Sequence, residues 1–339
     1  MRQAVLVGPR QFSVRDLPTP TPAPDEILVA VEAAGICGSD LHTYHGTNPV
    51  IKPPLVMGHE CAGTIARAGS ATGLQPGQRI ALEPDVPCGD CVYCRAGQTH
   101  LCPDMRFVGA IRYDGAFADF VIAPASAAVP LPLDMPADDG VFAEPVTVAV
   151  HAWEIVRNIP HDTVLVLGAG PIGNLVAQLS VVRGARRVGI TDIVDAKLNV
   201  AREVGIEHTV NPAKHDLAAW AAAVFGPTGP DITFDCVGIT ETVNQGLALT
   251  RRGGLVVLVG VSTQDLVIKP MEILLAERSL KGSYQYIHDD FVEAVRVLSQ
   301  GQMKVRPLIS KIFSLDHTEQ AFAFVDDRAN EALKVLVKP

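Results

Sequence analysis

The chain has 339 residues, of which 48% are hydrophobic and 19% charged, so it is long enough for two folded domains and too apolar to be disordered. Acidic residues (37) outnumber basic residues (28), the net charge is −9, and no basic tract occurs, which argues against nucleic acid and anionic membranes as partners. No apolar signal segment opens the sequence, and no apolar run is long enough to span a bilayer. We therefore expect a cytoplasmic protein that contacts no membrane.

The first zone of the chain, up to about residue 145, is rich in glycine and proline and contains short apolar runs. Alternate side chains are apolar in residues 26–33, which predicts a β-strand. Residues 61–68 and 116–122 predict two further short strands. The pattern indicates an irregular β-rich domain with long loops.

The middle zone has a different pattern of apolar residues. Residues 163–167 form a continuous apolar run, typical of a strand buried in a parallel sheet, and a helix with an apolar face follows. Strands and helices are then expected to alternate, at 187–191, 197–204, 208–210, 215–225, 232–235, 242–249 and 255–259. This alternation predicts an α/β fold with a doubly wound parallel sheet.

The last zone is too small to form a domain of its own. It predicts a helix at 289–298, a strand at 311–313, a short helix at 318–325 and a strand at 332–337. We expect this segment to return to the β-rich part. The predicted first domain therefore comprises residues 1–146 completed by 284–339, and the second comprises residues 147–283.

Four of the seven cysteines follow the spacing C-x2-C-x2-C-x7-C, at Cys88, Cys91, Cys94 and Cys102. Clustered thiols in a chain without a secretory signal favour metal ligands over disulfides. Four thiolates suit a tetrahedral zinc ion with no open position, so this segment predicts a structural zinc site.

A second group of metal-ligand types lies outside this segment: Cys37, His59, Glu60 and Glu144. Thiolate, imidazole and carboxylate all bind zinc, and ligands from separated segments are typical of a catalytic site with an exchangeable position. Taken singly, the cysteine and the histidine fit core positions equally well, and both glutamates fit a solvated surface.

A glycine-rich turn, Gly168-Ala169-Gly170-Pro171-Ile172-Gly173, stands between a predicted strand and a predicted helix, where its glycines allow close approach of a pyrophosphate to a helix N-terminus. Asp192 ends the next strand, where its carboxylate would bind the ribose hydroxyls and repel a 2′-phosphate, which favours NAD over NADP. Lys197 fits either a ribose contact or a solvated helix position. The residues expected at the cofactor are Gly168, Gly170, Pro171, Ile172, Gly173, Asp192, Lys197, Cys236 and Val259.

These motifs occur in the order seen in zinc-dependent medium-chain alcohol dehydrogenases, which the chain resembles over essentially its whole length. The motifs that carry the resemblance are Gly35-Ile36-Cys37-Gly38-Ser39-Asp40, Gly58-His59-Glu60, the four spaced cysteines, Glu144-Pro145 and the glycine-rich turn. The chain looks most similar to the polyol and sugar-acid branch, which includes sorbitol dehydrogenase-like enzymes and hexonate 5-dehydrogenases. The resemblance implies a GroES-like catalytic domain and a Rossmann NAD-binding domain.

The resemblance also implies roles for individual residues. Cys37 and His59 would bind the catalytic zinc directly, and Glu60 would bind it directly or through water. Glu144 stands where other alcohol dehydrogenases have a third cysteine ligand, a departure typical of the polyol branch. Ser39 would take the proton of the substrate alcohol, the cofactor ribose would relay it, and His42 would deliver it to solvent.

The expected reaction is oxidation of a secondary alcohol of a polyol or sugar acid to a ketone, with NAD as hydride acceptor and two zinc ions per subunit. Tyr44, His45, Phe107 and Arg112 are expected on loops flanking the site, and Arg112 fits either a substrate carboxylate or solvent. The open alternatives are a threonine 3-dehydrogenase-like or other alcohol dehydrogenase, a zinc-free reductase and a non-enzymatic zinc or NAD sensor. Family members form tetramers or dimers, so we expect a homo-oligomer, with a homotetramer as one form.

Overall fold

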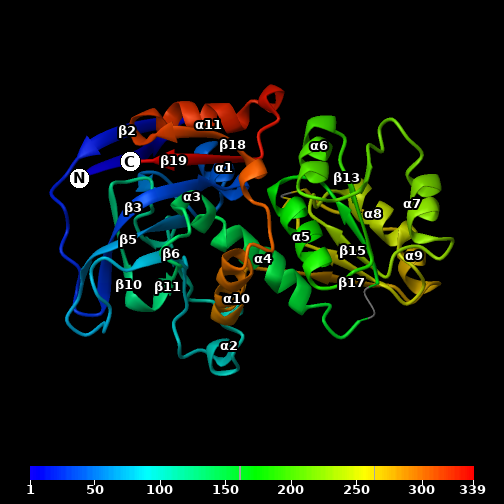
Figure 1. Cartoon of the computed structure of the whole chain (residues 1–339), viewed down its shortest axis with the longest axis horizontal. Coiled ribbons are helices and arrows are strands. Elements are labelled where there is room, and N and C mark those ends of the chain that lie inside the picture. Colours follow the sequence, from blue (N-terminus) through cyan, green and yellow to red (C-terminus); the bar gives the residue numbers. More distant parts are fainter. Residues whose placement is uncertain (160–161, 263) are drawn as a thin grey trace. The chain divides into compact units, whose positions relative to one another are not determined.

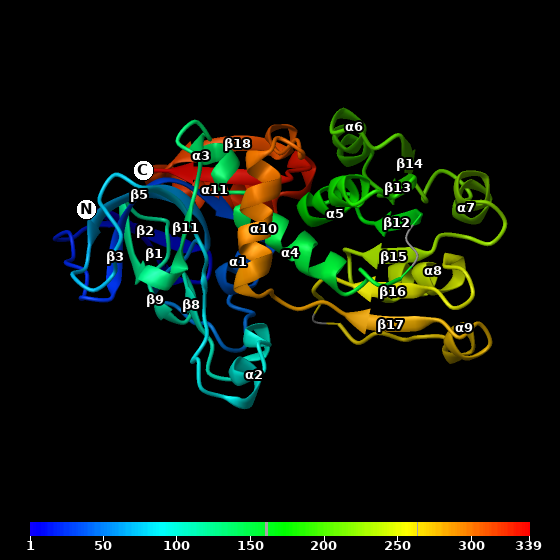
Figure 2. The same ribbon diagram turned by 60° about the horizontal axis from the view of Figure 1, so that its bottom comes forward.

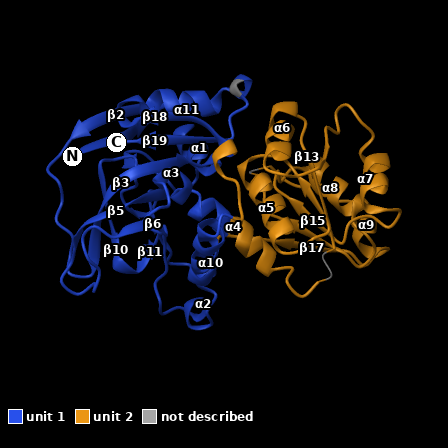
Figure 3. Ribbon diagram, viewed as in Figure 1, with its two compact units in different colours: residues 1–147, 286–301, 308–339 blue, residues 148–285, 302–307 orange. Residues whose placement is uncertain are grey.

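A computed structural model describes residues 1–159, 162–262 and 264–339. The chain divides into two compact units (Figure 3): unit 1 comprises residues 1–147, 286–301 and 308–339, and unit 2 comprises residues 148–285 and 302–307. The predicted domains did not separate residues 302–307 from the last zone. In the structure, the side chain of Gln178 ties residues 302–307 to unit 2, because it bonds both backbone groups of Lys304, at 3.2 and 2.7 Å.

The main sheet of unit 1 has the strand order β11-β6-β5-β3-β19-β18, and β10 pairs with β3 (Figure 1). Strand β3 has 11 residues and is buried over most of its length, with Ile27, Val29, Val31, Ala34 and Ile36 in the core of the unit. The strands of this sheet are β3 (Glu26–Ile36), β5 (Glu60–Ala68), β6 (Arg79–Leu82), β10 (Phe120–Pro124), β11 (Ala128–Pro130), β18 (Ile309–Ser314) and β19 (Lys334–Lys338).

Two small sheets and several helices complete unit 1. The small sheets are β2-β1-β4 and β7-β8-β9, formed by β1 (Arg2–Gly8), β2 (Gln11–Asp16), β4 (Leu55–Val56), β7 (Asp85–Val86), β8 (Arg106–Val108) and β9 (Arg112–Tyr113). The α-helices are α1 (Gly38–Tyr44), α2 (Val92–Arg95), α3 (Ala137–Gly140), α10 (His288–Ser299) and α11 (Thr318–Asp326), and α4 (Ala143–Glu154) runs on into unit 2. The short 3₁₀ helices are η1 (Thr99–Leu101), η2 (Ala125–Ala127), η3 (Arg306–Leu308), η4 (Leu315–His317) and η5 (Arg328–Asn330).

The strand expected at residues 116–122 was placed too early, because β10 begins at Phe120. The amide of Ala116 donates to the carbonyl of Gly58 at 2.8 Å, and the amide of Phe117 donates to the carbonyl of Met57 at 3.0 Å. These residues are therefore bonded to the segment before β5 and not to a neighbouring strand of the main sheet.

Unit 2 contains a parallel sheet of order β14-β13-β12-β15-β16-β17, whose strand order reverses between β12 and β15. This is the doubly wound α/β arrangement that the alternating pattern predicted. Its strands are β12 (Thr163–Leu167), β13 (Arg187–Thr191), β14 (His208–Val210), β15 (Ile232–Asp235), β16 (Leu255–Leu258) and β17 (Ser279–Gly282). Its helices are α5 (Pro171–Val182), α6 (Asp195–Glu203), α7 (Leu217–Phe225), α8 (Thr240–Leu249) and α9 (Pro270–Leu274). Within the residues placed by the structure, no helix has the length and apolar character needed to cross a membrane.

Candidate functional site

Cys37, His59 and Glu60 come together in unit 1. Cys37 immediately precedes α1, and His59 and Glu60 stand where the chain enters β5. One ligand atom from each residue lies within 4.8 Å of the other two. His59 and Glu60 are buried, whereas Cys37 is partly exposed. A thiolate, an imidazole and a carboxylate fit zinc, and three protein ligands leave the position that a catalytic zinc needs for its substrate.

Asp40 connects two members of this group, because it lies in the first turn of α1 between them. Its Oδ2 accepts the backbone N–H of Cys37 at 3.0 Å, and its Oδ1 lies 3.4 Å from Nδ1 of His59. A carboxylate at one ring nitrogen orients the imidazole and leaves the other nitrogen for a metal. Burial acts to lower the pKa of His59, but the charge and hydrogen bond of Asp40, with a contribution from Cys37, raise it well above its ordinary value.

Glu60 is fully buried and is paired with Lys334, which is itself only 2% exposed. The ammonium of Lys334 also donates to the carbonyl of Ile36 at 3.2 Å. Burial disfavours the charged form of Lys334, but the charges of Glu60 and Cys37 outweigh this effect and raise the pKa of the ammonium. The positive charge of Lys334 offsets the free-energy cost of burying the Glu60 carboxylate in unit 1.

Gly35 provides the space for this carboxylate. Gly35 lies opposite Glu60 in the β3–β5 ladder, and a Cβ added at Gly35 would stand 2.0 Å from Oε2 of Glu60. Any other residue at position 35 would displace the carboxylate.

Glu144 lies in the first turn of α4 and is 7% exposed. Its Oε1 accepts a hydrogen bond from the hydroxyl of Tyr286 at 2.9 Å. Burial raises the pKa of Glu144 to about 7, and the nearby charge of Glu60 acts in the same direction. No oxygen of Glu144 belongs to the group of ligand atoms from Cys37, His59 and Glu60 that lie within 4.8 Å of one another. Its role as a zinc ligand therefore stays a prediction.

The two residues of the predicted proton relay, Ser39 and His42, both belong to α1. Ser39 is exposed near the start of the helix, and His42 is half-buried in its last turn. Their placement on one short helix beside Cys37 is compatible with a path from the site to solvent.

The flanking residues divide into two groups. The ring of Phe107 faces that of His59, with centroids 5.3 Å apart, and Arg112 is exposed with a φ of 69°. The expectation that Tyr44 and His45 lie on loops flanking the site was wrong. Tyr44 is buried against Phe12 and Phe322, and His45 bonds Asp326 at 2.8 Å, so both side chains belong to the contact between α1 and α11.

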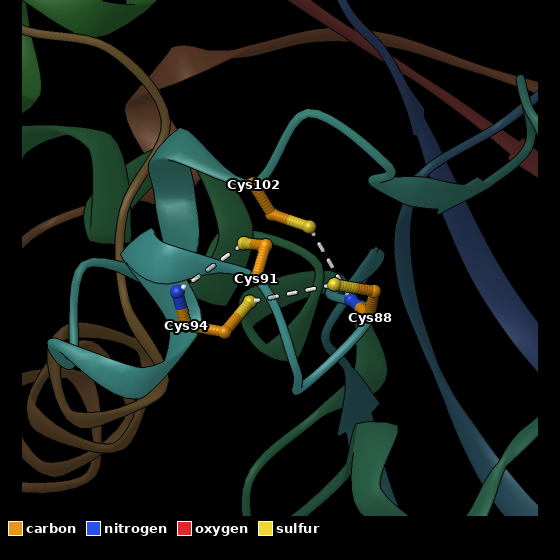
Figure 4. Close-up of side chains that lie close together, drawn as sticks. All are labelled: Cys88, Cys91, Cys94 and Cys102. Carbon is orange, nitrogen blue, oxygen red and sulfur yellow. Dashed lines mark hydrogen bonds between the residues drawn. The ribbon is translucent and has the colours of Figure 1, made fainter.

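The four spaced cysteines form a second cluster in unit 1, on a segment that stands out from the main sheet around α2 (Figure 2). The four side chains gather at one place (Figure 4), and their sulfurs lie within 4.8 Å of one another and form no disulfide. The sulfurs of Cys88 and Cys94 are 3.9 Å apart, close to the about 3.8 Å expected for a tetrahedron with Zn–S bonds of about 2.3 Å. Backbone hydrogen bonds from Asp90 and Cys91 lower the pKa of Cys88 to about 7. The donor set fits a closed structural zinc site.

The glycine-rich turn of unit 2 joins β12 to α5 as predicted. Gly168 has a φ of +95°, a conformation that favours glycine. A Cβ added at Gly173 would stand 1.8 Å from the carbonyl oxygen of Gly168, so only glycine allows the helix to pack against the turn. Gly170 precedes α5, and Pro171 begins it, with nothing within 4 Å of a Cβ added at Gly170. The open approach to this helix N-terminus suits a pyrophosphate.

Several predicted cofactor residues follow the carboxyl ends of neighbouring strands. Asp192, Cys236 and Val259 come directly after β13, β15 and β16. Asp192 accepts the backbone N–H groups of Ala169 and Val194, both at 2.9 Å, which fixes its carboxylate beside the turn. Ligands of doubly wound sheets bind at this edge. Lys197 lies on α6, half-buried.

Sequence reasoning missed the residues that pair with the predicted ligands. Asp40 had a local signal, since its carboxylate follows Cys37 by three residues in the manner of a capping box. Lys334 and Tyr286 had none, because both are far from their partners in the sequence.

The chain is similar to known proteins in both sequence and structure. The model of the alcohol dehydrogenase GroES-like domain matches residues 23–133, and the model of the zinc-binding dehydrogenase domain matches residues 171–300. The sorbitol dehydrogenase of Bacillus subtilis is 31% identical, with 100% of this chain and 97% of the relative covered. The L-idonate 5-dehydrogenase of Vitis vinifera is 32% identical, covering 98% of this chain and 93% of the relative. A Sinorhizobium meliloti protein whose crystal structure contains NADP matches with a TM-score of 0.93 at 35% identity, covering 100% of this chain and 99% of that chain.

Proposed function

Because this chain belongs to the zinc-binding alcohol dehydrogenase family and is an oxidoreductase acting on CH–OH donors, we propose that it oxidises a secondary alcohol of a polyol or sugar acid to the ketone, with NAD as hydride acceptor. The observation that carries the proposal is the convergence of Cys37, His59 and Glu60 within 4.8 Å. The substrate class is supported by the names of the two relatives, a sorbitol dehydrogenase and an L-idonate 5-dehydrogenase. Glu144, in the place of a third cysteine ligand, supports the same branch.

Zinc held by Cys37, His59 and Glu60 would supply a Lewis acid that lowers the pKa of the substrate hydroxyl. The side chains around it prepare the site for this chemistry. Asp40 holds the ring of His59 in place, and Lys334 holds the carboxylate of Glu60 through hydrogen bonds of 2.6 and 2.7 Å. In our proposal, the hydroxyl of Ser39 would take the proton of the substrate as it passes its own proton on toward solvent, and the ring of His42 would release a proton to water at the end of this relay.

NAD is the cofactor we propose, and the argument rests on Asp192. A carboxylate fixed at the end of β13 accepts hydrogen bonds from ribose hydroxyls and repels a 2′-phosphate. The preference for NAD over NADP needs an experimental test, because the similar Sinorhizobium meliloti protein was crystallised with NADP. The substrate is a small molecule, and we propose a homo-oligomer, a tetramer or a dimer, that works in the cytoplasm.

The function is tested by mixing the zinc-loaded protein with NAD⁺ and a panel of polyols and aldonates while following the absorbance of reduced nicotinamide. Turnover is expected for at least one member of the panel. Cys37→Ser should abolish turnover while leaving NAD binding and the fold largely intact, because a serine hydroxyl is a poor zinc ligand.

A matched control is Cys61→Ala, which removes a buried thiol of unit 1 that belongs to neither cysteine group. This variant should retain turnover. Full activity in Cys37→Ser, with zinc content unchanged, would contradict the assignment of the catalytic site.

A further inference from the structure

Asp85, the first residue of β7, is a buried carboxyl group without a partner. It is 7% exposed, and neither of its carboxyl oxygens has a hydrogen-bond partner among the residues that the structure describes. An unpaired buried carboxyl costs free energy that a paired one does not, and native structures contain few such groups. Asp85 therefore calls for a partner that the chain itself does not supply.

Four other buried carboxylates among the described residues of unit 1 have a side-chain partner. Each has a side-chain partner within 3.4 Å, and the pairs are Asp40 with His59, Glu60 with Lys334, Glu83 with His288, and Glu144 with Tyr286. Asp85 differs from these four carboxylates, because neither of its oxygens has such a partner among the described residues.

The register of the small sheet shows where Asp85 points. Asp85 lies opposite Phe107 in the antiparallel β7–β8 pair, and residues opposite each other project from the same face. The Phe107 ring, in turn, is 5.3 Å from the ring of His59. The carboxyl of Asp85 therefore projects on the side of the sheet that faces the predicted zinc ligands.

The electrostatic surroundings agree with this placement. Burial raises the pKa of Asp85 well above its ordinary value, and the charges of Glu144 and Glu83 raise it further, whereas His59 lowers it. The charges of these three groups are therefore near enough to Asp85 to act on it. Hydrogen-bond donors from a bound molecule would favour the ionised carboxylate and relieve the cost of its burial.

We propose that Asp85 is a specificity-determining residue that accepts hydrogen bonds from neighbouring hydroxyls of a neutral polyol bound at the Cys37–His59–Glu60 group. This inference rests on the proposed function and narrows its substrate class. Two adjacent hydroxyls offer two donors to the two free oxygens of Asp85. An aldonate carboxylate or a phosphate offers acceptors only at this position, and it would add negative charge beside Asp85, Glu83 and Glu144.

Arg112 is the residue that would favour the opposite substrate class. Its guanidinium fits a carboxylate, but it is exposed on β9 and makes no ion pair with the described residues. Asp85 is buried and aimed at the site, so it dominates the selection of substrate in our proposal.

The test compares kcat/KM for the best polyol of the panel and for its matching aldonate, in the wild-type protein and in Asp85→Asn. The wild type is expected to favour the polyol by at least about tenfold, and Asp85→Asn should reduce this preference by about tenfold or more, mainly through a higher KM for the polyol. Calorimetric binding of the polyol to the zinc-loaded protein with NADH should weaken by a similar factor. Asp104→Asn, which removes an exposed acidic charge from the same unit, should leave the preference unchanged.

Two results would overturn this inference while leaving the proposed function standing: a wild-type preference for the aldonate, or an unchanged preference in Asp85→Asn. A zinc-loaded wild-type protein that oxidises no polyol, no aldonate and no simple secondary alcohol such as 2-butanol would instead refute the proposed function, and this inference with it.

Discussion

The ammonium of Lys334 donates hydrogen bonds to both carboxylate oxygens of Glu60, at 2.6 and 2.7 Å. The two residues lie on β19 and β5, which are not neighbours in the sheet but flank β3 on either side. The sheet of unit 1 therefore brings a buried cation to a predicted zinc ligand and balances the charge of its carboxylate.

Replacing Lys334 with methionine should destabilise unit 1, because Glu60 would remain buried without its partner. Breaking a buried ion pair in this way costs about 3–5 kcal/mol. Urea denaturation measures the loss. Lys338→Met is the matched control, since Lys338 is on the same strand but pairs with Asp138 at a partly exposed position. Equal and small losses in both variants would show that the buried pair contributes little.

Replacing Cys91 with serine should remove the structural zinc and leave the catalytic one. Metal analysis should fall from about two zinc ions per chain to about one, and the Tm should fall because the four-thiolate segment loses its crosslink. Turnover per remaining catalytic zinc should change little. If Cys91→Ser kept both zinc ions and the wild-type Tm, the cysteine segment would not be a metal site.

Replacing Asp192 with serine should weaken the preference for NAD over NADP. The change removes a carboxylate fixed beside the glycine-rich turn, and a loss of at least about 1.4 kcal/mol in discrimination corresponds to about tenfold in the ratio of binding constants. Fluorescence titration with NADH and NADPH measures this ratio. Asp195→Asn should leave it unchanged, because Asp195 is already engaged by Lys214 and Asn211. A wild-type protein that binds NADPH more tightly than NADH would refute the choice of cofactor.

The pair of His288 and Glu83 should contribute stability that depends on pH. The hydrogen bond to Glu83, at 2.6 Å, raises the pKa of His288 above the about 6.5 of an unfolded chain. A raised pKa means that the contribution is fully present below pH of about 6.5 and is lost as the pH rises through the folded-state pKa. Because the His288 side chain is 56% exposed, we expect at most about 1 kcal/mol.

The measurement for this pair is the difference in unfolding free energy between wild type and His288→Asn across pH. The difference should be largest in the acidic range and shrink toward alkaline pH. His317→Asn serves as the control, since His317 bonds the hydroxyl of Ser314 and not a carboxylate. A difference that grew with pH would contradict the assignment.

The fold was largely predictable because its signals are local. The apolar run at residues 163–167 and the alternation after it identify the parallel sheet, and the alternating pattern of residues 26–33 identifies part of β3. The predictions failed where backbone partners come from elsewhere in the chain. Ala116 and Phe117 look like part of a strand, yet they bond the segment before β5.

The candidate site was predictable only in part, for the same physical reason. Cys37 and His59 stand in motifs that carry the resemblance to zinc-dependent dehydrogenases, whereas their neighbours in space do not. Lys334 lies in an apolar strand, where a lysine usually marks the solvated face, and its burial depends on the register of β19 with β3. Asp85 stands between two prolines in a segment that looks like a turn, and only its pairing with Phe107 shows where it points.

The distance along the chain between bonded partners has a consequence for biosynthesis. Cys88 and Cys102 contact each other across 14 residues, whereas Glu60 and Lys334 contact each other across 274. At about 5–20 residues per second, the cysteine segment can close within seconds of leaving the ribosome, but the partner of Glu60 is made roughly tens of seconds later. A growing chain can therefore complete the four-cysteine segment early. The Glu60–Lys334 pair beside the predicted catalytic zinc site can form only after unit 2 has been translated.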